Sequence, residues 1–211
     1  MNQPASTQGA RWQRRKSSRP SEILAAASDL FVSKGFSATK LDDVARQAGV
    51  SKGTVYLYFK NKETLFRELV KSVVVPALER AEAHAASHDG SAEDLLRQLI
   101  GIWQKSMRDP GLCGLPKLVI SEAGNFPDLA RFYVDTVVKR VRHLVMETLK
   151  AGVRSGEFRS CDYNHVARVI IGAMVFASVW ECSLAPFDDE PYETKKYFEA
   201  YIDITLKGLR V

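Results

Sequence analysis

TKLDDVARQAGVSKGTVYLYFK, residues 39–60, predicts two short helices joined by a tight turn. Thr39 is expected to cap the first helix, with Asp42 as its capping-box partner three residues later. Leu41 and Val44 begin an apolar stripe on one face of that helix. Gly49 then marks a sharp reversal, because such a turn needs a positive φ that glycine adopts at little cost.

The second helix is predicted to run from Ser51, its cap, to about Tyr58. Two helices around such a turn form a helix-turn-helix, which presents its second helix to the major groove of DNA. Thr54 and Tyr56 are expected to contact base edges, and Lys52 either reads guanine or holds a phosphate. Gly53 is expected to let the backbone come close to DNA. The predicted DNA-binding residues are Thr39, Lys40, Ser51, Lys52, Gly53, Thr54, Tyr56, Tyr58 and Lys60, of which Thr39, Lys40, Tyr58 and Lys60 fix the register on phosphates.

The segment AGVSKGTVYLYFKNKETLF, residues 48–66, resembles the DNA-binding signature of the TetR family of transcriptional regulators. The preceding segment ILAAASDLFVSKGFSATKLDDVARQ, residues 23–47, is similar to the first two helices of that family. The resemblance is close over about residues 20–71. It implies an all-α protein of about nine helices, with a three-helix DNA-binding domain followed by a helical domain for ligand binding and dimerisation.

The distribution of charge agrees with a DNA-binding amino-terminal part. Residues 1–71 hold 13 Lys and Arg against 6 Asp and Glu, a net charge of +7, whereas the remainder carries −2. Positive charge gathered in one domain is typical of nucleic-acid binding. A solvated basic face is the alternative explanation, and the helix-turn-helix pattern favours DNA.

The chain is predicted to divide into a disordered basic arm over 1–18, a DNA-binding domain over 19–71 and a second domain over 72–211. The arm either contacts phosphates or an adjacent minor groove, or serves as a solubilising tail. The first helix is expected over Pro20–Lys34, with the proline in its first turn. Pro76 is expected to kink the helix that joins the two domains, as a hinge or as a tolerated bend.

The compartment is predicted from the cysteines and from the apolar segments. Three widely spaced cysteines without a CxxC pattern do not suggest a disulfide framework and suit a reducing cytosol. The first ten residues lack the apolar region of a secretory signal. The longest apolar stretch, residues 166–180, is shorter than the roughly 20 residues of a membrane span. We therefore expect a cytoplasmic protein with no membrane partner.

Two helices, over residues 162–182 and 191–209, are apolar on more than one side. Such helices must be covered on both faces, and a second copy of the chain would cover the outer one. The resemblance also implies a dimer through the last two long helices. A two-fold dimer predicts a near-palindromic operator in double-stranded DNA. The predicted interface residues are Ile170, Ala173, Ala177, Phe198, Tyr201 and Ile202.

The second domain is expected to bind a small-molecule effector in an adaptable apolar pocket, since methionines and aromatic rings suit such a site. The resemblance implies the pocket and not its residues, and ordinary core packing is the alternative for each of them. The predicted ligand-binding residues are Trp103, Met107, Phe126, Phe132, Met146, Phe176 and Trp180, with Glu122, Glu181 or Arg168 as the polar contact.

Other classes of site and protein are less favoured. His84 and His88 have the i, i+4 spacing of a metal pair, although solvated histidines explain them better, and we expect no metal or cofactor. A redox sensor at Cys113 or Cys182 requires a reactive thiol. The usual catalytic motifs are missing, so an enzyme built on Cys and His with a fortuitous helix-turn-helix pattern is an outside alternative. A second domain of about 140 residues also exceeds what an architectural DNA clamp needs.

The sequence therefore predicts a transcriptional repressor that a small apolar or amphipathic ligand releases from its operator. An activator or a corepressor-dependent regulator of the same fold is the alternative.

Overall fold

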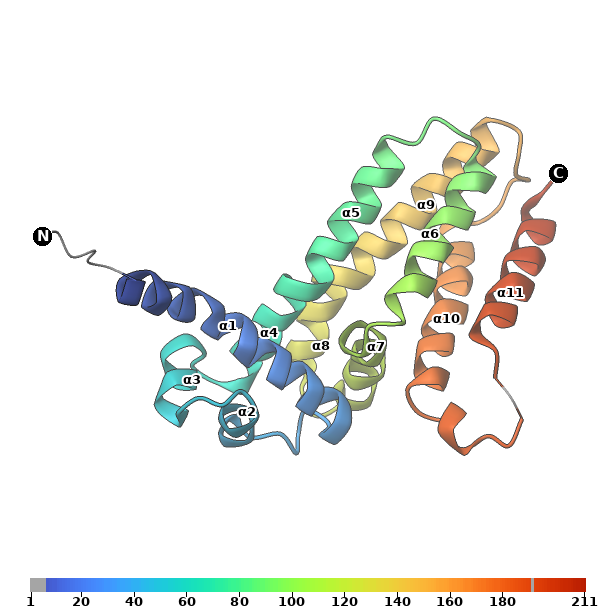
Figure 1. Cartoon of the computed structure of the whole chain (residues 1–211). Coiled ribbons are helices and arrows are strands. Elements are labelled where there is room, and N and C mark those ends of the chain that lie inside the picture. The colour runs from blue at the N-terminus through green and yellow to red at the C-terminus, as the bar shows by residue number, and fades with distance from the viewer. Residues whose placement is uncertain (1–6, 191) are drawn as a thin grey trace, which may run out of the picture. The chain divides into compact units, whose positions relative to one another are not determined.

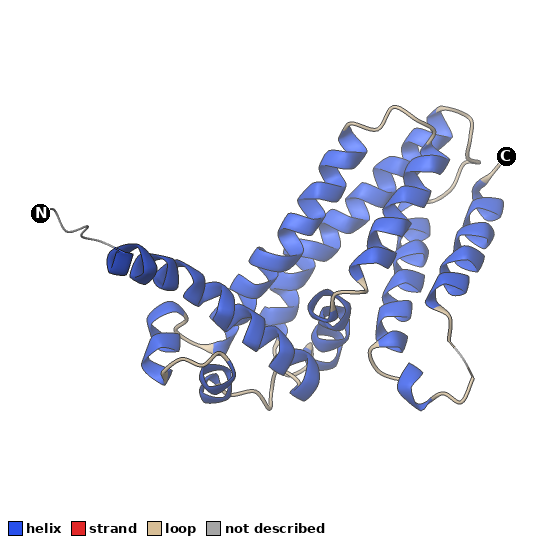
Figure 2. Cartoon of the chain, in the orientation of Figure 1, coloured by secondary structure: helices blue, strands red, loops and turns tan. Residues whose placement is uncertain are grey.

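The computed structural model describes residues 7–190 and 192–211, and of residues 7–18 only the backbone. The regular elements in this part of the chain are all helices, with loops between them and one isolated bridge between Phe158 and Arg210 (Figures 1 and 2). The chain divides into two compact units, Met1–Leu69 and Val70–Val211. No described helix is both long enough and apolar enough to cross a lipid bilayer.

The first unit consists of four helices around an aromatic core. Phe31 lies with its ring centroid 5.2 Å from that of Phe36 and 6.2 Å from that of Phe66. Ile23 and Leu65 are also fully buried there. These contacts fix the scaffold that carries the helix-turn-helix. The helices are α1 (Thr7–Lys34), α2 (Leu41–Gln47), α3 (Lys52–Tyr58) and α4 (Lys62–Leu69).

Helix α1 begins earlier than the sequence predicted. Residues 7–18 continue the helix toward the amino terminus, so the prediction of a disordered arm is wrong over this range. Gln, Ala, Arg and Lys are all good helix formers, which explains the extension. Pro20 consequently lies inside α1 and not in its first turn. The rest of the predicted arm, residues 1–6, lies outside the described residues.

The turn between α2 and α3 is confirmed as a glycine turn. Gly49 has a φ of +64°. Its amide donates to the Arg46 carbonyl oxygen at 3.2 Å, and the Val50 amide donates to the Ala45 carbonyl oxygen at 3.0 Å. These two bonds form a Schellman motif, which satisfies the last carbonyl groups of α2.

The start of α2 corrects another prediction. Lys40 is the N-cap, and it makes no side-chain capping bond, so Thr39 and Asp42 form no capping box. The Thr39 hydroxyl faces inward, within 2.7 Å of the Gly35 carbonyl oxygen and 3.2 Å of the Leu30 carbonyl oxygen. Thr39 thus holds the α1–α2 loop against the end of α1.

The second unit is a bundle of longer helices. In it α10 packs against α6, α7, α9 and α11 (Figure 1). The described residues form nine α-helical segments when helices joined through a π turn are counted as one. The elements are η1 (Val70–Val74, a π turn), α5 (Val75–Ala86), α6 (Ala92–Ser106), α7 (Pro110–Glu122), α8 (Pro127–Tyr133), η2 (Val134–Val138, a π turn), α9 (Lys139–Arg154), α10 (Tyr163–Glu181), the 3₁₀ turn η3 (Ala185–Phe187) and α11 (Thr194–Leu209).

The structure also bears on the kink expected at Pro76. Pro76 lies in the first turn of α5, directly after the π turn Val70–Val74. The wider turn accommodates the carbonyl group that proline leaves without a donor.

A short connection between α9 and α10 ties several helix ends together. The carboxylate of Glu157 accepts hydrogen bonds from the Ala92 and Glu93 amides at the start of α6, both at 3.1 Å. The Phe158 ring is buried against Gly152 of α9. The Arg159 amide donates to the Leu209 carbonyl oxygen at 2.8 Å. These contacts fasten α6, α9 and α11 around one loop.

Candidate DNA-reading surface and effector cavity

Helix α3 is fixed at both ends and along one side. The Ser51 hydroxyl accepts from the Thr54 amide at 3.1 Å, which confirms Ser51 as the cap. The Thr54 hydroxyl lies 2.8 Å from that of Ser51. Val55 is fully buried, and Phe59 just after the helix is buried too. The exposed side chains of α3 are consequently held in a defined orientation.

The exposed side of α3 carries an aromatic ring and a cation. Tyr56 is 49% exposed. The Lys52 ammonium donates to the Asp42 carboxylate at 2.9 Å and lies 5.8 Å from the Tyr56 ring centroid. The hydrogen bond to Asp42 also raises the pKa of Lys52. Lys52 is thus held on α3 as a cation, and it must exchange Asp42 for any group on a bound nucleic acid.

A shallow open cleft in the first unit brings several of the predicted DNA-binding residues together. Lys40, Lys52, Tyr56 and Lys60 all line it, from the start of α2 to the end of α3. Thr39 reaches the same cleft but is only 2% exposed. Its hydroxyl is engaged inside the unit, so the predicted phosphate contact through this side chain is corrected. A Cβ added at Gly53 would meet only the Ser51 hydroxyl oxygen, at 3.9 Å, and Tyr58 is half-buried.

Lys62 is a lining residue of the cleft that the sequence analysis did not select. Its ammonium donates to the Phe36 and Ser37 carbonyl oxygens at 2.8 and 3.0 Å and lies 4.6 Å from the Phe36 ring centroid. The basic run Lys60-Asn61-Lys62 is the feature of the sequence that could have identified it. Leu57, which the sequence did not single out, is 74% exposed on α3.

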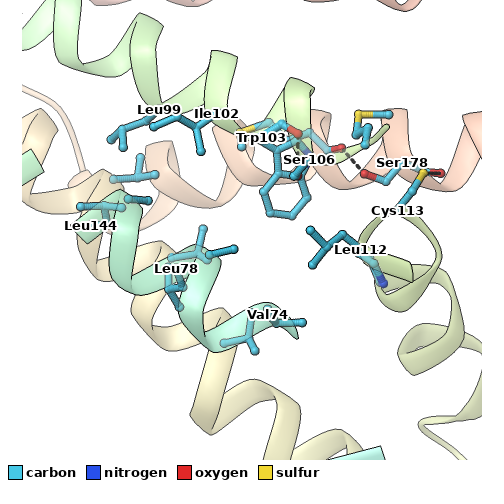
Figure 3. A pocket seen from close by; sticks show the side chains of 18 of the residues that line it. Val74, Leu78, Leu99, Ile102, Trp103, Ser106, Leu112, Cys113, Leu144 and Ser178 are labelled. Atoms are coloured by element: carbon cyan, nitrogen blue, oxygen red, sulfur yellow. Dashed lines mark hydrogen bonds between the residues drawn. The ribbon is translucent and has the colours of Figure 1, made fainter. Parts of the chain in front are cut away.

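The second unit contains an apolar cavity of about 120 Å³. Val74 and Leu78 lie across it from Leu99 and Ile102 of α6 (Figure 3). Among the described residues that line it, none is charged. The lining residues are Val74, Ala77, Leu78, Ala81, Leu99, Ile102, Trp103, Ser106, Met107, Leu112, Cys113, Pro116, Tyr133, Val137, Val141, Leu144, Val145, Met174 and Ser178.

The cavity includes two of the predicted ligand-binding residues, Trp103 and Met107. Phe176 is 54% exposed and lies against Trp180, with the ring centroids 5.8 Å apart. Met146 packs against the core cluster of the unit. These residues are absent from the lining of this cavity, so their role in ligand binding stays a prediction. The predicted residues outside the lining are Phe126, Phe132, Met146, Phe176 and Trp180, together with Glu122, Glu181 and Arg168.

The few polar groups around the cavity are neutral. The Trp103 Nε1–H is buried and has no hydrogen-bond partner among the described residues. The Ser106 and Ser178 hydroxyls donate to the Trp103 and Met174 carbonyl oxygens at 2.7 and 3.3 Å. Burial raises the pKa of Tyr133, which keeps its hydroxyl protonated. An uncharged, mostly apolar ligand with a hydrogen-bond acceptor suits this lining.

The structure contains a disulfide that the spacing of the cysteines did not predict. Cys113 of α7 and Cys182 after α10 form a disulfide across 69 residues of sequence, with their Cα atoms 6.8 Å apart. Cys161 is free and half-buried. The packing of α7 on α10 creates the pair, which a search for short spacings cannot reveal.

The two histidines with metal-like spacing have hydrogen-bond partners. The His84 ring is bonded to the Gln98 side chain, and His88 Nε2 lies 3.1 Å from the Ser91 carbonyl oxygen. No group of three metal-ligating side chains occurs among the residues that the structure describes.

Each of the last two helices, α10 and α11, has an inner face toward the core of its unit and an outer, exposed face. Ile170, Ala177 and Phe198 are buried in the core of their own unit, so their assignment to an interface between subunits is corrected. Tyr201 is half-buried and donates to the Ile170 carbonyl oxygen at 2.9 Å. Ala173 and Ile202 are also half-buried. The exposed apolar side chains on these helices are Val169, Phe176 and Ile204, at 74%, 54% and 71% exposure.

Comparisons with known proteins cover both units. A family model described as "Bacterial regulatory proteins, tetR family" matches residues 23–69. Another, described as "AefR-like transcriptional repressor, C-terminal domain", matches residues 94–207.

Individual relatives and solved structures agree with these matches. The HTH-type transcriptional repressor KstR2 of Rhodococcus jostii is 30% identical over 69% of this chain and 70% of its own. The fatty acid metabolism regulator protein of Bacillus subtilis is 24% identical over 92% of this chain and 98% of its own. The crystal structure of FadR from Bacillus subtilis in complex with stearoyl-CoA has a TM-score of 0.70 at 22% identity, covering 89% of this chain and 97% of that one.

Proposed function

Since the chain belongs to the TetR family of bacterial transcriptional regulators, we propose that it is a homodimeric repressor released from a near-palindromic operator by a small apolar ligand. Family membership makes the protein a ligand-responsive, DNA-binding regulator. The observation that carries the rest of the proposal is the uncharged cavity in the second unit, which suits a small apolar effector. An activator or a corepressor-dependent regulator would use the same reading helix. Measuring operator affinity with and without the effector separates these alternatives.

In this proposal α3 enters the major groove, and Tyr56 and Thr54 contact base edges. Lys40 and Lys60 line the same cleft as Tyr56 and hold phosphates, as Lys52 does after leaving Asp42. Phosphate contacts of this kind set the register of the helix, and the base contacts set the sequence.

The substitution Tyr56→Ala tests the reading helix. Because the ring is half exposed and supports no core contact, its loss should weaken specific operator binding by about 10- to 100-fold, in line with about 1–3 kcal/mol per base contact. Fluorescence anisotropy with the operator and with a scrambled duplex measures this. Gly101→Ala in the second unit is the matched control and should bind as the wild type does. Wild-type affinity in Tyr56→Ala would show that α3 is not the reading helix.

The dimer is proposed to form through the outer faces of α10 and α11. Val169, Gly172 and Phe176 follow one another at helical spacing on α10, and Ile204 and Gly208 do so on α11. Exposed apolar side chains beside exposed glycines allow two copies to approach closely, and pairing would remove this surface from water.

Phe176→Glu tests this interface without disturbing the buried core. A carboxylate on the outer face of α10 must be desolvated in a dimer, so we expect a monomer at micromolar concentration. Multi-angle light scattering measures the mass, and circular dichroism checks the fold. Lys195→Glu, which introduces the same carboxylate and changes the charge by two units at an 83% exposed side chain, should remain dimeric. A dimer in Phe176→Glu would place the interface elsewhere.

The effector is proposed to be a largely apolar molecule with an oxygen acceptor. The Trp103 Nε1–H is a buried donor that such an oxygen could satisfy, and the rest of the lining is hydrocarbon. A buried donor without a partner costs about 1–3 kcal/mol, which gives a ligand oxygen a reason to bind there. Two of the similar proteins, the fatty acid metabolism regulator protein and KstR2, are also named as regulators. The name of the fatty acid metabolism regulator protein suggests acyl compounds for a thermal-shift screen.

A further inference from the structure

The Cys113–Cys182 pair joins two walls of the effector cavity. Cys113 lies in the first turn of α7, and Cys182 is the C-cap of α10. Cys113 lines the cavity itself, as does Ser178 from α10 (Figure 3). Pro116 from α7 is another lining residue. A bond between these cysteines therefore fixes α7 to α10 at the edge of the ligand site.

The site can accommodate the reduced pair as well. Cys113 Sγ lies 3.7 Å from the Ser178 carbonyl oxygen, so a thiol there has an acceptor. Reduction consequently leaves the Cys113 thiol with a hydrogen-bond acceptor, while the two sulfur atoms separate to van der Waals distance.

Cys182 gives a small reagent access to the pair. It is half-buried at the end of α10, whereas Cys113 is only 3% exposed. Leu184, two residues further, is 49% exposed. The Lys117 ammonium donates to the Cys182 carbonyl oxygen at 3.3 Å, so a positive charge lies beside the pair and favours an approaching or departing thiolate.

The size of the cavity connects this bond to ligand binding. A cavity of about 120 Å³ is comparable to an engineered cavity of about 150 Å³ that binds benzene. Pockets for larger ligands span about 300–1,000 Å³. A ligand larger than benzene therefore requires the walls of the cavity to move apart, and a disulfide between α7 and α10 opposes the movement of these two walls.

We propose that Cys113 and Cys182 form a reversible disulfide that controls the affinity of the cavity. The dithiol form admits a large apolar ligand, and the disulfide form resists it. The ligand part rests on the proposed function of the cavity as the effector site, while the thiol chemistry does not.

The exchange uses a low-molecular-weight thiol as the reductant. Its thiolate attacks Cys182 Sγ, the Cys113–Cys182 bond breaks, and Cys113 leaves as a thiolate that takes up a proton. A second thiolate attacks the outer sulfur of the mixed disulfide and releases Cys182, which is also protonated. Two thiols are oxidised to one disulfide as the protein gains two electrons and two protons, and oxidation is the reverse reaction.

The first measurement follows the bond itself in the full-length protein. The protein is equilibrated with glutathione at a series of reduced-to-oxidised ratios, alkylated with N-ethylmaleimide and mapped by mass spectrometry. We expect the Cys113–Cys182 peptide to pass from linked to alkylated across the series, while Cys161 is alkylated throughout. A pair that stays in one state across the series, or a disulfide that includes Cys161, overturns the proposal.

The second measurement follows binding of N-phenyl-1-naphthylamine, a neutral fluorescent probe larger than benzene. We expect at least about five-fold tighter binding to the reduced protein, the lower end of typical coupling between sites. Cys182→Ser, which leaves the cavity lining unchanged, should bind like the reduced protein at every ratio, and Cys161→Ser should respond like the wild type. Equal affinity of oxidised and reduced wild-type protein overturns the proposal even if Cys182→Ser does not fold.

Neither measurement involves DNA, so the two proposals fail separately. A normal redox response in a protein without operator affinity counts against the proposed function alone. Normal operator binding without a redox response counts against the switch alone.

Discussion

The first unit, which carries the helix-turn-helix, and the second unit, which contains the cavity, differ in the sequence separation of the contacts that define them. In the first unit, the Ser51 hydroxyl accepts from the Thr54 amide three residues later, and the Val50 amide donates to the Ala45 carbonyl oxygen five residues earlier. In the second, the cavity draws its walls from residues 74 to 178, and the disulfide joins residues 69 positions apart. A local motif can therefore be read along the chain, whereas the cavity exists only after the helices have packed.

Glycine shows the same contrast. Gly49 of the first unit is needed for its backbone conformation, with a φ of +64° and open space where a Cβ would lie. Gly152 of the second unit is needed for space, because a Cβ there would overlap the buried Phe158 ring. One requirement concerns the local chain and the other a tertiary contact.

Gly152→Ala gives the largest expected effect on stability. The added methyl group collides with a ring that is 2% exposed, so we expect a loss of about 1–3 kcal/mol in the free energy of unfolding. Urea denaturation followed by circular dichroism measures it. Gly101→Ala, also within a helix but with no atom near the added methyl group, should gain about 0.5–1 kcal/mol. Equal effects at both sites would mean that the contact with Phe158 does not constrain α9.

Ser51→Ala and Ser91→Ala remove equivalent helix caps, one from each unit. Each hydroxyl accepts from the amide three residues later, at 3.1 and 3.0 Å, so each loss should cost about 1 kcal/mol of stability. Only Ser51→Ala should also weaken operator binding, since α3 is the proposed reading helix. Denaturation and anisotropy on both variants test this, and equal losses of DNA affinity would remove the functional distinction between the units.

Glu93→Gln gives the smallest effect and depends on pH. A bidentate hydrogen bond from Arg210, at 2.6 and 2.8 Å, lowers the pKa of Glu93 to about 2. Because the unfolded value is about 4.3, the ion pair stabilises the folded protein above that pH and is lost as pH falls toward 2.

The wild type should therefore exceed Glu93→Gln by less than about 1 kcal/mol at pH 7, as is usual for a surface pair, with the difference vanishing near pH 2. Denaturation at a series of pH values measures the difference. A constant difference across this range would mean that Arg210 does not hold the carboxylate in its ionised form.

Most of the first unit could be predicted from the sequence. The cap at Ser51, the turn at Gly49 and the burial of Val55 all follow from spacing within one short stretch. Thr39 is the instructive exception. A threonine before a helix suggests a cap, but the end of α1 offers the carbonyl groups of Gly35 and Leu30, and its hydroxyl turns inward to them.

The second unit was predicted only as a class of structure. Helical periodicity identified apolar residues on α10 and α11, but it could not say which apolar side faces the subunit core. Ile170 and Ala177 face inward, while Val169 and Phe176 face outward. The cavity residues were missed for the same reason: Leu78, Val141 and Met174 have the same pattern as ordinary core residues until the helices are in place.

Cys161 lies outside the disulfide, and this has a practical consequence for experiments. With the other two cysteines joined, a maleimide dye or spin label can be attached at this natural position without mutagenesis. Burial raises the pKa of the Cys161 thiol, so labelling should be faster at alkaline pH than at neutral pH. Labels on two such molecules would report the spacing between copies in solution.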